Sequence, residues 1–255
     1  MADFSLAGQI ALVTGGSRGL GRHFAEVLAK EGAEVALFAR DQKALEHAAA
    51  AIAKATGRRT LAIAGDVTES ASLAAAFERA EQTLGRVSIL INNAGIAVAK
   101  PVIEHSAADW DRVLDTNLKG AFLASQEFAR RRIMAKAGGR IVNIASLLAF
   151  RTAKQIPSYV AAKAGLAHLT RDLAMEWARY GITVNALAPG YFETDLNRDF
   201  LNSEAGQAVT ARIPFGRIGQ MPELDGALLL LTSKAGGYIT GAVLPVDGGH
   251  GVAPA

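Results

Sequence analysis

Residues 14–21 read T-G-G-S-R-G-L-G, and from this glycine-rich turn the fold can first be inferred. The turn follows an apolar run at 10–13 and precedes an amphipathic segment at 24–28, which predicts a strand, a turn and a helix that begins at Gly19. Glycine permits positive φ and a close approach of the backbone to phosphate, while the first turn of a helix presents free N–H groups. The stretch therefore predicts a diphosphate site, although an ordinary tight turn would use the same glycines.

The spacing of the glycines is informative in its own right. Three residues separate Gly15 from Gly19, whereas the dinucleotide fingerprint G-x-G-x-x-G has a single residue at that place. The pattern here, T-G-x-x-x-G-x-G, therefore predicts a longer loop between the strand and the helix.

Length and composition limit the class of protein. A chain of 255 residues, half of them apolar, can bury a large core, and residues 1–255 are expected to form one domain. The absence of cysteine excludes disulfides and thiolate chemistry and suits a reducing compartment. The first residues carry an acid where a signal peptide needs positive charge, and no apolar run approaches ~18 residues. We expect a soluble, cytoplasmic protein with no membrane partner.

Charge and histidine content argue against two further classes. The formal net charge is +3, and the basic residues are scattered apart from Arg130, Arg131 and Arg132, which we interpret as a solvated helix end. A nucleic-acid partner would require a basic stripe, so none is expected. The five histidines form no H-x-x-x-H or H-E-x-x-H pair, so we expect no catalytic metal.

Apolar runs and amphipathic segments alternate along the chain. The runs predict strands at 10–13, 34–39, 60–64, 87–91, 140–144 and 183–187, with an edge strand at 243–246. The segments predict a helix from Gly19, a second at 41–56 capped by Asp41, and others at 70–84, 107–136, 158–180 and 222–231. This alternation predicts an α/β fold: a doubly wound parallel sheet (Rossmann fold) with helices on both faces and a ligand crevice at the carboxyl ends of the strands.

Tyr159 and Lys163 lie four residues apart in an expected helix, so both side chains project from one face. A free tyrosine has a pKa near ~10, which is too high for a proton shuttle near neutral pH. An adjacent ammonium would favour the phenolate and lower that pKa. The alternative is a tyrosine at the edge of the core beside a snorkelling lysine, and an isolated Y-x-x-x-K would favour it.

Two more polar residues favour the catalytic interpretation of this pair. Ser146 follows an expected strand, so its hydroxyl is expected at the crevice to which the helix delivers the Tyr159 phenol. Asn117 lies in an expected helix among residues that are otherwise apolar or long. Taken singly, Ser146 also suits an N-cap or a turn, and Asn117 suits a bond to a neighbouring carbonyl or to solvent.

Together these motifs resemble the classical short-chain dehydrogenase/reductase family over nearly the whole chain. The matching positions follow the family's order: residues 14–21, Asp66-Val67, Asn92-Asn93-Ala94-Gly95, Asn117, Ser146, Tyr159, Lys163, Pro189-Gly190 and Thr194. The resemblance implies that Tyr159 is the general acid/base and that Ser146 hydrogen-bonds the substrate oxygen. It also implies that Lys163 lowers the pKa of the tyrosine and holds the nicotinamide ribose, and that Asn117 anchors a water in the proton relay.

The same resemblance implies a dinucleotide cofactor. Asp66 would accept from the adenine amine, Asn93 to Gly95 would line the adenosine, and Phe192 with Thr194 would hold the carboxamide. The alternatives are helix capping for Asp66 and turn formation for residues 92–95. The expected cofactor contacts are Gly15, Ser17, Arg18, Gly19, Leu20, Gly21, Arg40, Asp66, Val67, Asn93, Ala94, Gly95, Tyr159, Lys163, Pro189, Gly190, Phe192 and Thr194.

The end of the second strand predicts which cofactor is used. An NAD-binding protein of this fold usually has an acid there to accept from the ribose 2′-hydroxyl, but the residue is Ala39, followed by Arg40. Arg18 in the glycine turn would form the other side of a cationic clamp for a 2′-phosphate. We therefore predict NADP(H) over NAD(H). In the alternative, Arg40 merely flanks Asp41, whose carboxylate accepts from the ribose.

The function expected from the resemblance is hydride transfer between nicotinamide C4 and a ketone or secondary alcohol. A non-catalytic nucleotide-sensing or interaction protein on the same fold is the main alternative, because a fold does not specify a function. An intact set of Ser146, Tyr159 and Lys163 argues against it. An epimerase or dehydratase of the extended branch of the family would need a longer chain and a different glycine spacing.

Substrate selectivity is expected from residues 147–156, 96–100 and 191–212, of which the last is polar and irregular and is interpreted as a lid. Arg151, Lys154, Arg198 or Arg212 would receive a carboxylate or phosphate, although lone surface cations more often face solvent. The resemblance favours reductases of 3-oxoacyl thioesters and dehydrogenases of gluconate-like acids. We predict an anionic or anion-tethered ketone as substrate.

The expected helix at 158–180 carries many small residues, including Gly165, which costs up to about 1 kcal/mol relative to alanine within a helix. So much small and apolar surface predicts a second helix packed closely against it. By family resemblance this helix and the one around Asn117 form a two-fold interface, and the strand at 243–246 forms another. We therefore expect a homotetramer of D2 symmetry.

Overall fold

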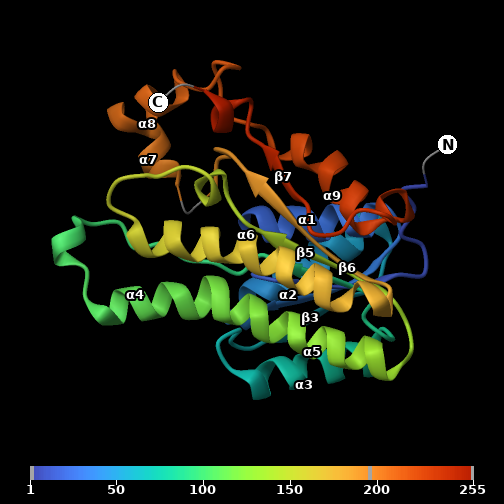
Figure 1. Cartoon of the computed structure of the whole chain (residues 1–255). Coiled ribbons are helices and arrows are strands. Elements are labelled where there is room, and N and C mark those ends of the chain that lie inside the picture. The colour runs from blue at the N-terminus through green and yellow to red at the C-terminus, as the bar shows by residue number, and fades with distance from the viewer. Residues whose placement is uncertain (1–2, 195–196, 254–255) are drawn as a thin grey trace.

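The computed structural model describes residues 3–194 and 197–253, which contain one seven-stranded sheet with every pair of neighbouring strands parallel. The strands are β1 (Ile10–Thr14), β2 (Glu34–Ala39), β3 (Thr60–Ala64), β4 (Ile89–Asn92), β5 (Gly139–Ile144), β6 (Ile182–Pro189) and β7 (Val243–Val246). Their order across the sheet is β3-β2-β1-β4-β5-β6-β7, and Figure 1 labels β3, β5, β6 and β7 of this sheet. The chain adds β2 and β3 on one side of β1 and the other strands on the other side. The predicted doubly wound parallel sheet is confirmed.

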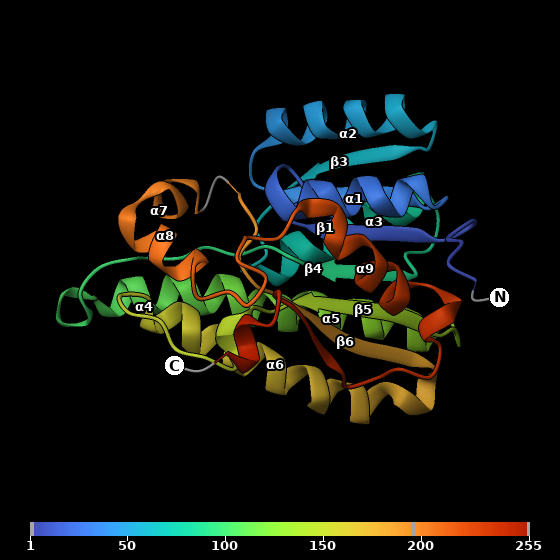
Figure 2. The ribbon, with the colours of Figure 1, turned by 90° about the horizontal axis from the view of Figure 1, so that it is seen from above.

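Helices occupy both faces of this sheet (Figure 2). Within the described residues they are α1 (Gly19–Lys30), α2 (Gln42–Thr56), α3 (Ser70–Thr83), α4 (Ala107–Leu114), α5 (Gly120–Met134), α6 (Pro157–Trp177), α7 (Arg198–Asn202), α8 (Glu204–Thr210) and α9 (Asp225–Thr232). Local signals set several of their ends. Asp41 caps α2 as predicted, with its Oδ1 accepting the N–H of Ala44 at 3.0 Å.

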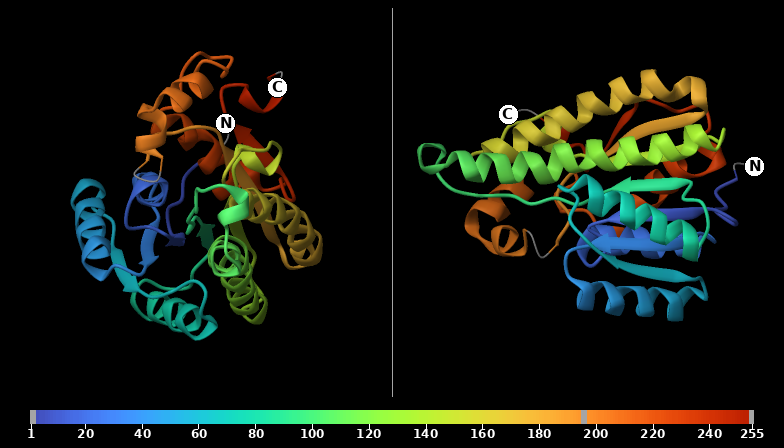
Figure 3. Two further views of the ribbon diagram at one scale, coloured as in Figure 1. Left: turned by 90° about the vertical axis from the view of Figure 1, so that its left-hand side faces the viewer. Right: turned by 90° about the horizontal axis from the view of Figure 1, so that it is seen from below.

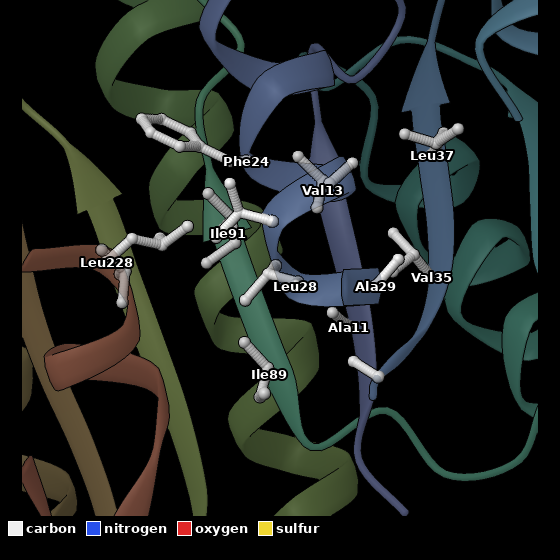
Figure 4. Close-up of a cluster of buried hydrophobic side chains, with 14 of the residues drawn as sticks. Ala11, Val13, Phe24, Leu28, Ala29, Val35, Leu37, Ile89, Ile91 and Leu228 are labelled. Atoms are coloured by element: carbon white, nitrogen blue, oxygen red, sulfur yellow. The ribbon is translucent and has the colours of Figure 1, made fainter. Parts of the chain in front are cut away.

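Successive residues of the central strands point to opposite faces of the sheet, so each strand contributes side chains to the core on both faces. Val13 of β1 is fully buried on one face with Leu28 of α1 and Leu228 of α9 (Figure 4). Leu12, the preceding residue, is buried on the opposite face, where Phe77 of α3 and Phe128 of α5 lie 6.4 Å apart between ring centroids. The right-hand view of Figure 3 shows α3, α5 and α6 across this second face. Burial of each large side chain contributes roughly 2 kcal/mol relative to exposure.

The expected helix at 107–136 is interrupted. A π-helical turn, η2 (Asp115–Lys119), separates α4 from α5, and the N–H of Gly120 bonds to the carbonyl of Asp115, five residues earlier. One π turn shifts the apolar pattern by a single residue, so sequence periodicity could not reveal it. Such turns are often found at functional sites.

Two predictions about the last third of the chain need correction. The supposedly irregular residues 191–212 contain α7 and α8, and Ser203 caps α8 by accepting the N–H of Gly206 at 3.2 Å. Both helices are too short for periodicity to show them. The helix expected at 222–231 begins as a 3₁₀ turn, η5 (Met221–Leu224), and becomes α-helical only at Asp225.

The arginine triplet is not simply a solvated helix end. Arg131 of α5 pairs with Glu127 and with Glu81 of α3, each at 2.7 Å, and it also donates to the carbonyl of Ala74 at 3.2 Å. Arg132 donates to the carbonyl of Gly138 at 2.7 Å. Arg131 therefore joins α3 and α5, which sequence spacing could not show because its partners in α3 are distant along the chain.

Gly165 of α6 has a close neighbour within the same chain. A Cβ built on Gly165 would lie 3.0 Å from Leu118 Cδ2, which belongs to η2. The close helix contact inferred from this glycine is therefore intramolecular, and Gly165 carries no argument for a partner subunit. Within the described residues no helix is long and apolar enough to cross a membrane.

Candidate active site

A cleft of about 620 Å³ opens at the carboxyl ends of the strands, where the chain order reverses between β1 and β4. It is lined by every residue that the sequence nominated for the cofactor except Gly21, and also by Ser146. Among its other lining residues are Asp41, Ile96, Thr116 and Asn197. Ser146, Tyr159 and the expected cofactor contacts thus share one cavity.

The glycine turn is shaped by its fit to the loop after β4. Gly15 and Gly19 have φ of +66° and +54°, which favour glycine. A Cβ on Gly15 would lie 2.8 Å from Asn93 Nδ2, and one on Gly21 would collide with the carbonyl of Gly15. Gly21 therefore does not line the cleft, but it lets α1 approach the turn. This cradle, open at the first turn of α1, suits the diphosphate of a dinucleotide.

Thr14 fastens the glycine turn to β4, a role that the sequence analysis missed. Its hydroxyl donates to the carbonyl of Ile91 at 3.3 Å and accepts the N–H groups of Asn93 and Ala94 at 3.0 and 3.1 Å. The Asn93 amide returns two bonds, to the carbonyls of Thr14 and Gly15. Asn93 and Ala94 thereby line the cleft with their backbones fixed.

Two arginines stand at the far end of the cleft from Tyr159. Arg18 and Arg40 both line it, both are exposed, and neither guanidinium group makes a hydrogen bond or ion pair within residues 3–194 and 197–253. Ala39, the last residue of β2, precedes Arg40, while the Asp41 carboxylate is engaged at the start of α2. This donor set fits a phosphate better than a ribose hydroxyl.

Asp66 is held in a turn and does not cap a helix. Its Oδ1 accepts from the N–H and the hydroxyl of Thr68, each at 2.9 Å, and the residue at the N-cap of α3 is Glu69. The alternative of helix capping is therefore wrong for Asp66. Its N–H donates to Ser72 Oγ at 3.0 Å, which fixes the carboxylate at the wall of the cleft.

Ser146, Tyr159 and Lys163 meet at the other end of the cleft. Ser146 follows β5 and begins a 3₁₀ turn, η3 (Leu147–Ala149), where its Oγ accepts the N–H of Leu148 at 3.1 Å. Tyr159 and Lys163 lie one turn apart on α6, with Lys163 Nζ 5.6 Å from the centroid of the tyrosine ring. The buried ammonium also donates to the carbonyl of Ile144 at 2.6 Å.

Burial dominates the acid–base properties of this group. Desolvation raises the pKa of Tyr159, and the hydrogen bond with Ser146 offsets only part of that rise. Desolvation also lowers the pKa of Lys163 to about 8. Burial therefore favours the neutral forms of both side chains, and the lowering of the Tyr159 pKa by Lys163 stays a prediction.

Asn117 is brought near the cleft but does not line it. It is buried in η2, where its Oδ1 accepts the N–H of Ile96 at 2.8 Å and its Nδ2 donates to the carbonyl of Ile96 at 2.9 Å. The alternative of a bond to a neighbouring carbonyl therefore describes this side chain. Asn117 holds the loop after β4, and the anchoring of a water stays a prediction.

Asn197 organises the segment after β6, and the sequence analysis did not single it out. Its Oδ1 accepts the N–H of Thr194 at 2.8 Å, and its Nδ2 donates to the carbonyl of Phe192 at 2.9 Å. An asparagine three residues after Thr194 is a turn signal that could have identified it. Part of the proposed lid, residues 195 and 196, lies outside the described residues.

The basic residues nominated for the substrate are only partly available. Arg151 Nη1 donates to the carbonyls of His250 and Ala253 at 2.6 and 2.8 Å. Arg198 pairs with Glu193 at 2.9 Å. Lys154 and Arg212 are exposed. Arg151 is therefore a structural tie to the C-terminal segment, which the sequence could not show because its partners are backbone atoms about a hundred residues away.

A family model described as enoyl-(acyl carrier protein) reductase matches residues 15–251. The 2-dehydro-3-deoxy-D-gluconate 5-dehydrogenase of Dickeya dadantii is 38% identical over 249 residues, 96% of each chain. The 3-oxoacyl-(acyl-carrier-protein) reductase FabG of Escherichia coli is 39% identical over 242 residues, which are 95% of this chain and 97% of that protein. This chain belongs to the short-chain dehydrogenase/reductase family.

As a member of that family, the chain is an oxidoreductase that acts on CH–OH and C=O groups. Its fold has close counterparts among solved structures. A gluconate 5-dehydrogenase from Burkholderia cenocepacia, in complex with NADP and tartrate, superposes with a TM-score of 0.94 at 37% identity over 99% of both chains. A levodione reductase superposes with a TM-score of 0.92 at 32% identity over 97% of this chain and 99% of that chain.

Proposed function

We propose that this short-chain dehydrogenase/reductase uses NADP(H) to interconvert an anionic or anion-tethered ketone and its secondary alcohol, with Tyr159 as general acid/base. The observation that carries the proposal is the single cleft shared by the glycine turn, Arg40, Ser146, Tyr159 and Lys163. The open cradle of the turn and its unpaired cations suit the phosphates of the cofactor.

Bound NADPH supplies a hydride to the carbonyl carbon in the reductive direction. The residues of this chain bind and protonate the carbonyl oxygen. The Ser146 hydroxyl donates a hydrogen bond to the carbonyl oxygen, and Tyr159 gives its phenolic proton to the same atom, which completes the secondary alcohol. A raised pKa keeps Tyr159 protonated near neutral pH, as a proton donor requires. Lys163, in its protonated form, stabilises the phenolate that remains.

The cofactor preference rests on Arg18 and Arg40. A 2′-phosphate carries negative charge and several acceptor oxygens, which guanidinium groups bind in bidentate geometry. Three solved relatives contain NADP, which supports the proposal. Arg40→Ala should lower kcat/KM with NADPH by about 10- to 100-fold, the loss typical of a charged hydrogen bond, with a much smaller effect for NADH.

Arg58→Ala is the matched control because Arg58 is exposed, makes no ion pair in the described residues and lies outside the cleft. It removes the same charge and should leave the cofactor preference unchanged. A wild-type kcat/KM that favours NADH over NADPH would contradict the proposal.

The substrate class follows from the relatives and from the cations around the cleft. Curated relatives include enzymes named for gluconate, for 2-dehydro-3-deoxy-D-gluconate and for 3-oxoacyl-(acyl-carrier-protein). All three names denote a ketone or alcohol that carries or is tethered to negative charge. Purified protein should therefore oxidise NADPH faster with keto-sugar acids or 3-oxoacyl thioesters than with neutral aromatic ketones or steroids, measured by loss of absorbance.

A non-catalytic nucleotide-sensing or interaction protein is the alternative that this assay tests. Such a protein would bind NADPH with unchanged affinity in the presence of every ketone and would oxidise none. The buried contact of Lys163 with the Ile144 carbonyl, and its approach to Tyr159, favour the catalytic function, because a mere binding module has no need of an ionisable pair at the end of its cleft.

A further inference from the structure

The C-terminal segment lies against the loop that follows Ser146, a residue of the cleft wall. After β7 the chain forms a 3₁₀ turn, η7 (His250–Val252), which Figure 2 shows in red beside the loop that follows β5. Asp247 holds this segment from within, with its carboxylate accepting the N–H groups of Gly249 and Gly251 at 2.9 and 2.7 Å. Arg151 holds it from outside through the carbonyls of His250 and Ala253. The turn is therefore held in place beside the loop that follows Ser146.

These ties hold the His250 ring beside Tyr191, which belongs to the segment 191–212 from which we expect substrate selectivity. Its centroid lies 5.7 Å from that of Tyr191, which follows Pro189-Gly190 at the end of β6. Tyr191 in turn stacks on Phe200 of α7 at 6.2 Å. Tyr191 is also close enough to Tyr159 to act on it electrostatically. The three rings thus form a row from the C-terminal turn, through Tyr191, to α7, the first helix of the proposed lid.

His250 keeps its hydrogen-bonding capacity unused. Nδ1 is buried without a partner, and Nε2 makes no hydrogen bond within the described residues. A buried N–H without an acceptor is rarer than a buried acceptor without a donor, so the neutral ring is expected to carry its proton on Nε2. Burial and the neighbouring Arg151 and Arg212 lower the pKa of His250, while Asp247 opposes them, so the ring is uncharged at neutral pH.

We propose that His250 is a specificity-determining residue that donates from Nε2 to a hydroxyl oxygen of a polyhydroxylated keto acid, at a carbon away from the reacting carbonyl. An uncharged donor against an aromatic wall suits a sugar hydroxyl, which needs a directional bond and no charge. The exposed Arg212 nearby supplies positive charge for the carboxylate of the same substrate. This inference rests on the proposed function and selects sugar acids within it.

The test compares two anionic ketones that differ in their hydroxyl groups, 5-ketogluconate and levulinate. His250→Phe keeps a ring against Tyr191 but removes the donor, and His250→Gln keeps an uncharged N–H at a similar reach. His250→Phe should lower the ratio of kcat/KM values, 5-ketogluconate over levulinate, by about tenfold through KM, as expected for one lost hydrogen bond. His250→Gln should recover part of that ratio.

His47→Phe is the matched control, because His47 is exposed on α2 and outside the cleft. Thermal unfolding and NADPH affinity of each variant check that the fold is intact. An equal loss for both ketones, or none, would overturn the role of His250. Wild-type turnover of acetoacetyl-CoA but not of 5-ketogluconate would also overturn it while leaving the proposed function standing. No NADPH oxidation with any of the three ketones would overturn the proposed function and this inference with it.

Discussion

Burial favours the neutral form of both Tyr159 and Lys163. The pKa of Tyr159 is raised and that of Lys163 is lowered to about 8. A protonated phenol is the form that donates to a carbonyl oxygen in reduction, and Ser146 is its hydrogen-bonding partner. The oxidative direction needs the opposite form, so positive charge on Lys163 matters most there.

Removal of the phenolic proton should separate chemistry from binding. Tyr159→Phe keeps the ring and should reduce kcat by at least ~10²-fold, with NADPH affinity nearly unchanged, because the proton acts chiefly in the transition state. Steady-state kinetics and NADPH fluorescence titration measure the two quantities. Tyr238→Phe, at a fully exposed position, is the control and should behave as wild type. Retention of most of the wild-type kcat by Tyr159→Phe would refute the assignment.

The lowered pKa of Lys163 predicts how stability depends on pH. Between about 8 and 10.5 the unfolded chain holds a proton on Lys163 that the folded chain has released, so the free energy of unfolding rises with pH from this group. Relative to Lys163→Met, wild type should gain at most about 1.4 kcal/mol per pH unit from about pH 8 to about pH 10. Above that range the raised pKa values of Tyr159 and Tyr191 act with the opposite sign. Urea unfolding without added nucleotide checks the slope, and parallel curves for the two proteins would contradict it.

At the scale of elements, the cleft depends on how closely α1 and the loop after β4 approach the glycine turn. Thr14 and Asn93 join the turn to that loop, and Asn117 of η2 holds the same loop from the other side. Each of these ties satisfies buried backbone groups, so its loss leaves donors or acceptors unpaired at about 1–3 kcal/mol each. The cofactor site is thus built by contacts between elements.

A single methyl group should loosen this junction. The Cβ of Gly21→Ala would meet the carbonyl of Gly15 and the Asn93 amide, so α1 must move away from the turn. We expect a loss of roughly 1–3 kcal/mol in the free energy of unfolding together with weaker NADPH binding. Gly226→Ala in α9 is the control, because its Cβ meets nothing within 4 Å and alanine favours a helix. Equal urea midpoints for the two variants would be the contrary result.

At the scale of the whole molecule, α5 and α6 lie side by side over one face of the sheet, with Met134 and Met175 on their exposed surfaces (Figure 3). Because Gly165 packs on Leu118 within the chain, the expectation of a homotetramer now depends on the family resemblance alone.

Light scattering tests that assembly directly. We predict a mass about four times the 26.6 kDa of one chain at micromolar concentration, because the D2 arrangement would cover the outer faces of α5 and α6 and the β7 edge. Met175→Glu should weaken the assembly by placing a charge in the covered surface, whereas Lys54→Glu, on α2, should not. A monomeric mass for wild type would disprove the homotetramer.

Patterns that are local in sequence were enough for much of the fold. The apolar runs, the capping Asp41 and the glycine turn each act within a few residues, so they identify strands, helix ends and the crevice without knowledge of distant contacts. The four-residue spacing of Tyr159 and Lys163 is also local, because one helical turn brings both side chains to one face. Ser146 could be assigned to the same site because it follows a parallel strand whose carboxyl end lies at the crevice.

Contacts between distant segments decided the rest, because hydrogen bonds and burial depend on the folded chain. Only the tertiary structure shows that Thr14 and Asn117 tie the loop after β4, that Asn197 organises the segment after β6, and that Arg151 is committed to the C-terminal turn. The raised pKa of Tyr159 also depends on the folded chain, since desolvation by the surrounding residues outweighs the hydrogen bond with Ser146. The sequence by itself determined which groups are present, and the packing determined which of them remain free to act.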